Sequence, residues 1–166
     1  MKIRPALTKD RGQIDAILRA AFLAAFGRSD EPELVARLRA QGDVLLELVA
    51  EEDKAVVGHI LFSRAHVSSS GKWHPVVQLA PVCAEPERHK RGIGSALIRQ
   101  GLALMTALDE THVFLLGHPG YYPRFGFSAK AAEAFDSPWP GPHFMLNRIG
   151  AGGPPSGKLA VSTAFV

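Results

Sequence analysis

The run Leu79-Ala80-Pro81-Val82-Cys83-Ala84 leads directly into Glu85-Pro86-Glu87-Arg88-His89-Lys90-Arg91-Gly92-Ile93-Gly94-Ser95-Ala96-Leu97. An apolar strand here passes through a basic loop and opens a helix. The start of a helix presents unpaired backbone N–H groups and the positive end of the helix dipole, and both favour a bound phosphate. Because Gly92 and Gly94 have no side chains, a ligand can approach the backbone closely. The run therefore predicts a site for one small anionic ligand at the start of this helix.

The same glycines also suit a plainer role without a ligand. The glycines could equally belong to a solvated basic loop before an ordinary helix, because short glycine motifs often occur by chance. Two longer phosphate-binding motifs are excluded. A dinucleotide-binding fingerprint needs a third glycine where Leu97 stands, and a P-loop needs a Gly-Lys-Ser/Thr run that the sequence lacks.

Outward from this junction, the sequence predicts an α+β domain with a central, largely antiparallel sheet. Apolar residues at helical spacing predict helices, and runs of alternating or β-branched residues predict strands. Gly58 predicts a bulge or a close backbone approach, and Pro81 predicts an interruption of strand pairing, because proline has no N–H to donate. The predicted strands cover 3–6, 44–50, 55–67, 73–84, 111–116, 143–149 and 158–165, and the predicted helices follow Asp10 as far as Gly27, cover 31–41, follow Gly92 as far as Asp109, and form a short turn after His118.

Length and composition restrict the class of protein. With 166 residues, of which 46% are hydrophobic and 21% charged, the chain suits a single domain over 1–166. Its net charge of +3 is mild, although the pI of about 9.2 makes a nucleic-acid-binding module one hypothesis. One cysteine and no metal-ligand spacing of histidines predict a protein without a metal or an internal disulfide. Without a signal segment at its start or an apolar run of membrane-spanning length, we expect a cytoplasmic protein with no membrane partner.

The run from Leu79 to Leu97 resembles the acetyl-CoA-binding motif of the GNAT superfamily of N-acetyltransferases, whose signature is Gln/Arg-x-x-Gly-x-Gly/Ala after a strand. Further on, Tyr121-Tyr122-Pro123-Arg124-Phe125-Gly126-Phe127 resembles the family element Tyr-x-x-x-Gly-Phe. With the opening strand and the two helices after it, the resemblance extends to about Phe127. It implies a GNAT-like α+β fold, a mixed, mostly antiparallel sheet of about seven strands flanked by helices, with a splayed cleft between the fourth and fifth strands.

The resemblance also implies acetyl-CoA as cosubstrate and a role for each matching residue. Backbone groups of the fourth strand would contact the pantetheine arm, and the loop and helix start would wrap the pyrophosphate through backbone N–H groups. Tyr122, four residues before Gly126, would protonate the leaving CoA thiolate as the catalytic residue. The expected cofactor-binding residues are Val82, Cys83, Ala84, His89, Lys90, Arg91, Gly92, Ile93, Gly94 and Ser95.

Three positions qualify these roles. His89 stands where the family usually has Gln or Arg, which matters little for a loop that acts through its backbone. Gln78 stands where histone-type members place a glutamate base, and acetylation of protein lysines is disfavoured because an amide does not usefully accept a proton. Cys83 is expected to be a buried residue and not a nucleophile, since no base lies near it in the sequence. No general base is assigned.

The resemblance identifies the chain as an N-acetyltransferase that transfers acetyl from acetyl-CoA to an amine of a small molecule or a peptide N-terminus. A non-catalytic acyl-CoA-binding or sensor domain is the first alternative, because it would keep the phosphate loop without needing Tyr122. A nucleic-acid-binding module is the second, but the basic residues cluster at one helix start and we expect no nucleic-acid partner. Phe22, Phe26, Trp139 and Phe144 predict an apolar wall for the acceptor, and the state of assembly stays open between monomer and homodimer.

Overall fold

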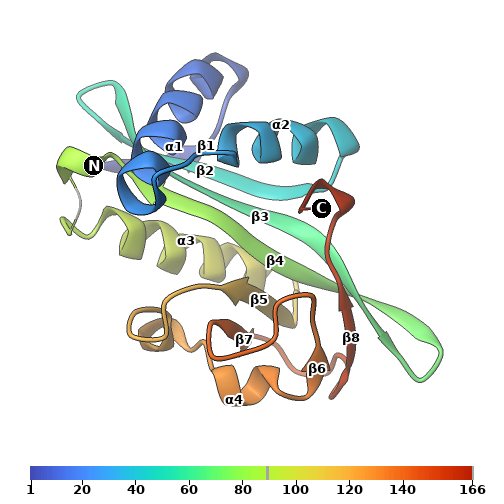
Figure 1. The fold of residues 1–166 in the computed structure, drawn as a ribbon. Helices are drawn as coiled ribbons and strands as arrows, with labels where there is room; N and C mark the ends of the chain where they lie inside the picture. Colours follow the sequence, from blue (N-terminus) through green and yellow to red (C-terminus); the bar gives the residue numbers. More distant parts are fainter. Residues whose placement is uncertain (89, 166) are drawn as a thin grey trace.

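The computed structural model describes residues 1–88 and 90–165, which form one mixed sheet flanked by helices (Figure 1). Six strands follow one another in the order β1-β2-β3-β4-β5-β7, while β8 pairs with β3 and with β6. The pairings of β4 with β5 and of β6 with β8 are parallel, and the others are antiparallel. The predicted sheet is thereby confirmed, with eight strands in place of about seven. The strands are β1 (Lys2–Pro5), β2 (Val44–Glu52), β3 (Ala55–Ser69), β4 (Lys72–Ala84), β5 (His112–Leu116), β6 (Phe135–Asp136), β7 (Phe144–Arg148) and β8 (Gly157–Ala160).

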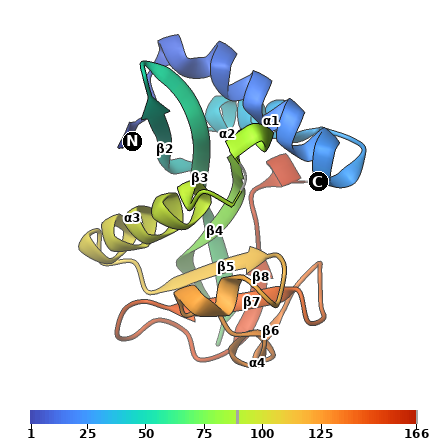
Figure 2. The same cartoon turned by 90° about the vertical axis from the view of Figure 1, so that its left-hand side faces the viewer.

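Helices cover both faces of this sheet. α1 and α2 lie on one face and α3 lies on the other (Figures 1 and 2). Helix α2 begins and ends as predicted, with Pro32 in its first turn and Gly42 in a left-handed conformation directly after it. The helices are α1 (Arg11–Phe26), α2 (Glu31–Gln41), α3 (Ile93–Ala107) and α4 (Ala129–Ala132), with short 3₁₀ turns η1 (Thr8–Asp10), η2 (Pro86–Arg88), η3 (Tyr122–Phe125) and η4 (Thr163–Phe165).

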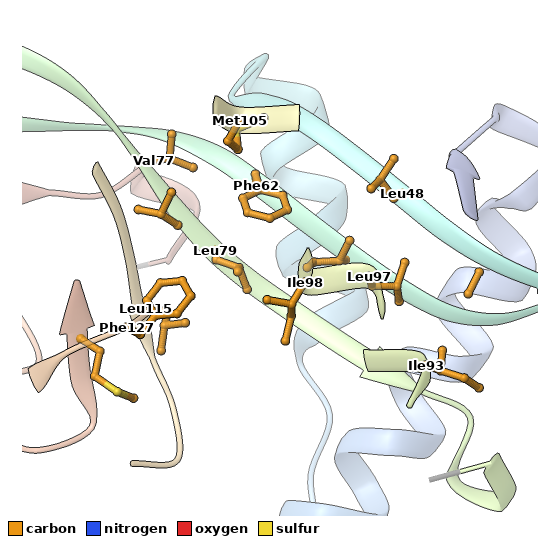
Figure 3. Packing of buried hydrophobic residues seen from close by; sticks show 14 of the residues in the cluster. Leu48, Phe62, Val77, Leu79, Ile93, Leu97, Ile98, Met105, Leu115 and Phe127 are labelled. Carbon is orange, nitrogen blue, oxygen red and sulfur yellow. The ribbon is translucent and has the colours of Figure 1, made fainter. Parts of the chain in front are cut away.

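Strand β3 contributes to hydrophobic cores on both faces of the sheet, because successive residues of a strand point to opposite faces. Ile60 and Phe62 pack on the α3 side, and Leu61 packs on the side of α1 and α2. Figure 3 shows the core on the α3 side, where side chains of the helix meet those of β3 and β4. Burial of each large apolar side chain stabilises the fold by about 1.5–3 kcal/mol, so this core holds α3 firmly against the strands.

Two glycines let α3 lie very close to β3. A Cβ atom on Gly58 of β3 would lie 2.6 Å from Cγ2 of Ile93, and one on Gly101 of α3 would lie 2.3 Å from Cε2 of Phe62. The register between β2 and β3 also shifts next to Gly58. The prediction at Gly58 is therefore confirmed, because the strand has a register shift there and the backbone lies close to α3. The close approach brings the start of α3 next to the end of β4.

Strands β4 and β5 pair over a short stretch and then separate. Val77 pairs with Val113 and Gln78 with Phe114, and among the described residues no further pairs join the two strands. The register of β4 against β3 also shifts beside Pro81. The interruption predicted at Pro81 and the splayed cleft between the fourth and fifth strands are thereby confirmed, and the far half of β4 has a free edge on this side.

The C-terminal region differs from the prediction in three places. Helix α4 and strand β6 were not predicted, because four and two residues are too few to show a hydrophobic period. Of the strand predicted over 158–165, only the first part is β8, and the chain then turns into η4. Ser162 donates to Asp43 at 2.6 Å and Arg37 donates to the carbonyl of Ala164 at 3.0 Å. These contacts near α2 replace the strand pairing.

Candidate functional site

The outer edge of β4 presents backbone groups to the opening. The N–H of Glu85 donates to the carbonyl of Val57 at 2.8 Å, so Glu85 points its backbone groups toward β3. Because residues of an antiparallel strand alternate in direction, Cys83 also points its backbone groups toward β3. Val82 and Ala84 then point theirs into the opening. This edge is suited to bind an extended chain that carries amide groups.

Cys83 faces away from the opening. Its side chain is buried in the core beneath α1 and α2, and burial raises the pKa of the thiol to about 12. A thiol with that pKa stays protonated near neutral pH and is a poor nucleophile. The expectation of a buried, unreactive cysteine is confirmed, but neither its side chain nor its backbone is turned toward the opening.

The start of α3 lacks a side-chain cap. Gly92 precedes the helix in a left-handed conformation with φ of 82°, and no side-chain oxygen of the described chain caps the first turn. The N–H groups of residues 93–95 are therefore available to a ligand. Apart from adjoining backbone, a Cβ on Gly94 would meet only the hydroxyl of Tyr121, at 3.6 Å. His89, also predicted to contact the cofactor, lies outside the described residues.

The basic loop before α3 carries less unpaired charge than the sequence indicates. Arg88 donates to Glu85 at 2.8 Å and also to Glu52. Arg91 lies 3.9 Å from Glu52, whereas Lys90 is exposed. Two of the three cations are thus partly neutralised by carboxylates, which leaves Lys90 and the backbone N–H groups of the helix start as the groups that could attract an anion.

The two tyrosines at η3 make different contacts. The Tyr121 hydroxyl lies 2.8 Å from Oγ of Ser95, in the first turn of α3. The Tyr122 ring packs against Phe127, and burial, with a smaller contribution from Tyr121, raises the pKa of Tyr122 to about 12. Over residues 1–88 and 90–165, no group hydrogen-bonds to the Tyr122 hydroxyl. Tyr122 therefore keeps its proton and has it available for donation.

Gly117 is a site residue that the sequence did not single out. It directly follows β5, and a Cβ atom there would lie 2.3 Å from Cε2 of Tyr122. The missing side chain thus provides the space in which the Tyr122 ring lies. The run Gly117-His118-Pro119-Gly120 signals a turn, but no local pattern shows that a ring will pack back onto its first residue.

Few polar groups near the opening are available as a base. Gln78 is buried where the strands separate, and its Oε1 has no partner in the described structure. Glu85 accepts a hydrogen bond from Arg88 at 2.8 Å, and Nδ1 of His118 lies 3.0 Å from the N–H of Gly120, which donates to it. The Nδ1 of His118 is therefore occupied, and Glu85 is held in an ion pair through one of its two carboxylate oxygens.

The aromatic residues predicted to line an acceptor site separate into three groups. Phe22 and Phe26 of α1 stack with ring centroids 5.7 Å apart. Trp139 packs edge-on against Phe165 at 6.2 Å. Phe144 is buried in the core around β5 and β7, so it does not line a surface. The prediction that Phe144 lines an apolar wall for the acceptor is therefore wrong. The other three aromatic side chains lie near or at the surface.

The surface beside the basic loop is hollowed. A hollow of about 560 Å³ there is bordered by the β2–β3 turn and by Lys2, Lys54, Arg88 and Arg91, among others.

In the described part of the chain, no three His, Cys, Asp or Glu side chains come together as a metal site requires. None of its helices is both long and apolar enough to cross a membrane.

A free strand edge that leads to an uncapped, glycine-rich helix start is the arrangement implied by the family resemblance, and residues 2–129 match the acetyltransferase (GNAT) domain model. The chain belongs to the GNAT acetyltransferase family. This GNAT chain is 37% identical over 128 residues to the uncharacterized N-acetyltransferase YjhQ of Escherichia coli K12, a match that covers 75% of this chain and 71% of YjhQ.

Solved structures support the same assignment. A GNAT family acetyltransferase from Brucella melitensis, in complex with acetyl-CoA, is 36% identical, with a TM-score of 0.83 over 99% of this chain and 97% of that one. YhbS from Escherichia coli, in complex with CoA, is 30% identical, with a TM-score of 0.86 over 99% of this chain and 91% of YhbS. The predicted GNAT fold and the prediction of an acetyltransferase are confirmed.

Proposed function

We propose that this GNAT protein binds acetyl-CoA in the opening between β4 and β5 and transfers the acetyl group to an amine of a small molecule or a peptide N-terminus. The observation that carries this proposal is the continuity of two binding surfaces. The free edge of β4 ends close to the uncapped start of α3. The acetyl-CoA and CoA complexes of the Brucella and Escherichia coli proteins support the same ligand here.

Each part of acetyl-CoA has a matching group in the opening. The backbone groups of Val82 and Ala84 would hydrogen-bond to the amides of the pantetheine arm, which is itself an extended chain. The N–H groups of residues 93–95 would hold the pyrophosphate, where the helix dipole adds favourable charge. Cys83, although predicted as a contact, is left out because its groups face away.

The reaction requires a neutral amine nitrogen that attacks the thioester carbonyl carbon. The C–N bond forms, the nitrogen of the tetrahedral intermediate loses a proton to water, and the intermediate collapses as the C–S bond breaks. Backbone N–H groups at the free edge of β4 would stabilise the oxyanion. Tyr122 would donate its proton to the departing thiolate as a general acid. Since the pKa of Tyr122 is about 12, the tyrosine carries this proton throughout the physiological pH range.

A non-catalytic sensor is the main alternative for the same fold. Such a domain would need the helix start and the strand edge, but it would gain nothing from a proton donor. The Tyr122 hydroxyl, which has no hydrogen-bond partner within the described chain, favours the enzyme. The Tyr121 hydroxyl, in contrast, already has a partner in Ser95.

Thermal unfolding with acetyl-CoA, followed by thiol release, tests the proposal. At about 100 times its Kd, acetyl-CoA should stabilise the fold by ~2.7 kcal/mol. Thiol release would then be followed with polyamines, amino acids, aminoglycosides and short peptides with free N-termini. An unchanged Tm at millimolar acetyl-CoA would contradict the binding site. Stabilisation without amine-dependent thiol release would instead support the sensor.

A further inference from the structure

A second hollow lies between the first turn of α1 and the end of α2. Its volume is about 310 Å³, and it shares no residue with the opening that we assign to acetyl-CoA. The connection from β1 to α1, the last turn of α2 and the beginning of β2 form its wall. The residues that line it are Ala6, Leu7, Thr8, Arg11, Arg39, Gly42, Val44 and Glu47.

One carboxylate and two guanidinium groups line this hollow. The two oxygens of Glu47 accept from Arg39 at 2.5 and 3.2 Å, and Nε2 of the fully buried His59 lies 2.8 Å from Oε1 of the same carboxylate. Although burial raises the pKa of Glu47, the hydrogen bonds with His59 and Arg39 outweigh it and lower the pKa to about 2. Glu47 is therefore ionised near neutral pH, and Arg39 balances its charge.

Arg11 has no comparable partner. Its side chain is exposed, and no carboxylate in the described part of the chain forms an ion pair with it. The acidic residues that flank the hollow in the sequence are engaged elsewhere, since Asp10 accepts from Arg4 at 2.7 Å and Asp43 accepts from Ser162 at 2.6 Å. The lining of the hollow therefore carries one positive charge that is not compensated.

Arg39 is fixed in place and still has donors to offer. Its Nε and Nη2 bind Glu47, whereas its Nη1 makes no hydrogen bond within the described residues. The ion pair holds the guanidinium plane before a ligand arrives, which reduces the entropy that binding would cost. Arg11 and the Thr8 hydroxyl line the same hollow. Because guanidinium groups bind carboxylates through two parallel hydrogen bonds, this set of donors suits a carboxylate.

The remainder of the wall is small and apolar. Ala6, Leu7 and Val44 contribute it, and the Leu7 side chain is 51% exposed. Covering such a surface with the carbon chain of a ligand is favourable, because apolar area is removed from water. Uncompensated positive charge beside a short apolar surface, in a hollow of this size, suits an organic acid with a short carbon chain better than an inorganic ion.

We infer that this hollow binds a small organic carboxylate with a short apolar chain, and that Arg11 and Nη1 of Arg39 hold the carboxylate. The site is separate from the acetyl-CoA opening, so the inference goes beyond the proposed function and does not depend on it. No covalent bond is made or broken there. A ligand bound between the start of α1 and the end of α2 contacts both helices, and it should therefore stabilise the fold.

Butyrate is the probe, titrated at constant ionic strength and followed by calorimetry and thermal unfolding. It should bind saturably with one site per chain and raise the Tm. Butyramide, which has nearly the same shape without the charge, and inorganic phosphate, an anion without a carbon chain, should bind more weakly. Arg11→Gln should raise the Kd for butyrate by about tenfold or more, because a charge-assisted hydrogen bond is lost. Without butyrate its Tm should equal that of the parent, since Arg11 is exposed and forms no ion pair in the described chain.

The matched control is Lys9→Gln. Lys9 is exposed in η1, two positions before Arg11, and it does not line the hollow. The substitution removes the same charge from the same region, so it should leave the Kd for butyrate unchanged. A second control repeats the titration with the protein saturated with acetyl-CoA. Butyrate should bind with the same Kd, because the two sites have no residue in common.

Four outcomes would overturn the inference. These are the absence of saturable butyrate binding, equal affinity for butyramide or phosphate, equal effects of Arg11→Gln and Lys9→Gln, and displacement of butyrate by acetyl-CoA. The last of these would place the carboxylate in the opening between β4 and β5. The proposed function is judged separately, by stabilisation with acetyl-CoA and by amine-dependent thiol release, and neither result depends on whether butyrate binds.

Discussion

The hydroxyl of Tyr121 lies 2.8 Å from Oγ of Ser95, which joins the turn after β5 to the first turn of α3. The two residues are far apart in the sequence, and they meet beside the helix start that we assign to the pyrophosphate. This contact uses the hydroxyl of the first tyrosine and leaves that of Tyr122 without a partner in the described structure. The pair of tyrosines is thus divided into one that holds the site together and one that is available for chemistry.

Replacing Tyr122 by Phe tests this division. Tyr122→Phe keeps the ring and its packing against Phe127, so Tm and acetyl-CoA affinity should stay the same. The proton for the thiolate is lost, and kcat should fall by ~10²-fold or more at saturating acetyl-CoA. Tyr121→Phe removes the bond to Ser95 and should have a smaller effect on kcat. Equal, small losses in both variants would mean that neither tyrosine is the acid.

Substitutions at Gly94 test the phosphate site. Gly94→Glu would place a carboxylate over the free N–H groups of the helix start, so binding of acetyl-CoA should be lost while the fold is retained. Gly94→Ala is the control, because its Cβ would approach the Tyr121 hydroxyl only to 3.6 Å, an ordinary contact distance. Calorimetry with acetyl-CoA and far-UV circular dichroism give the two readouts. A Gly94→Glu protein that binds like the parent would show that the pyrophosphate lies elsewhere.

Gly117→Ala tests whether the position of the Tyr122 ring matters. The new methyl group would lie 2.3 Å from the ring, which must therefore move. We expect kcat to fall by about tenfold or more, since small displacements of a catalytic group are costly, while acetyl-CoA affinity changes little. Gly12→Ala in α1 is the matched control, because nothing lies within 4 Å of its Cβ. It should raise stability by about 0.5–1 kcal/mol without affecting the rate.

The ion pair between Asp10 and Arg4 predicts how the free energy of unfolding depends on pH. Arg4 hydrogen-bonds to both carboxylate oxygens of Asp10, at 2.7 and 2.9 Å, and this contact lowers the pKa of Asp10 from 3.8 to about 2. A lowered folded-state pKa means that the contribution to stability is present above about pH 4 and is lost as the pH falls toward 2. Asp10→Asn should therefore lower the free energy of unfolding at pH 7 and flatten its fall between pH 4 and 2. Urea unfolding at several pH values measures both, and parallel curves for the two proteins would refute the assignment.

Local signals in the sequence were sufficient to predict the main helices and strands, the interruption of β4 and the start of α3. The helix stops at Gly27 and Gly42, the interruption at Pro81 and the glycines of the α3 entry each depend on the conformation of one or a few neighbouring residues. Because such preferences act on the backbone where they occur, they can be read without knowledge of the rest of the fold.

The positions of the two tyrosines depend on contacts between distant segments. Ser95 meets Tyr121, and the ring of Tyr122 fills the space left by Gly117, because packing of α3 and η3 against the sheet brings them together. The unpartnered Oε1 of Gln78 has the same origin, since its burial exists only after other elements cover the sheet. Residue type and spacing carry no record of which side chain ends without a partner, so that information arises with the tertiary structure.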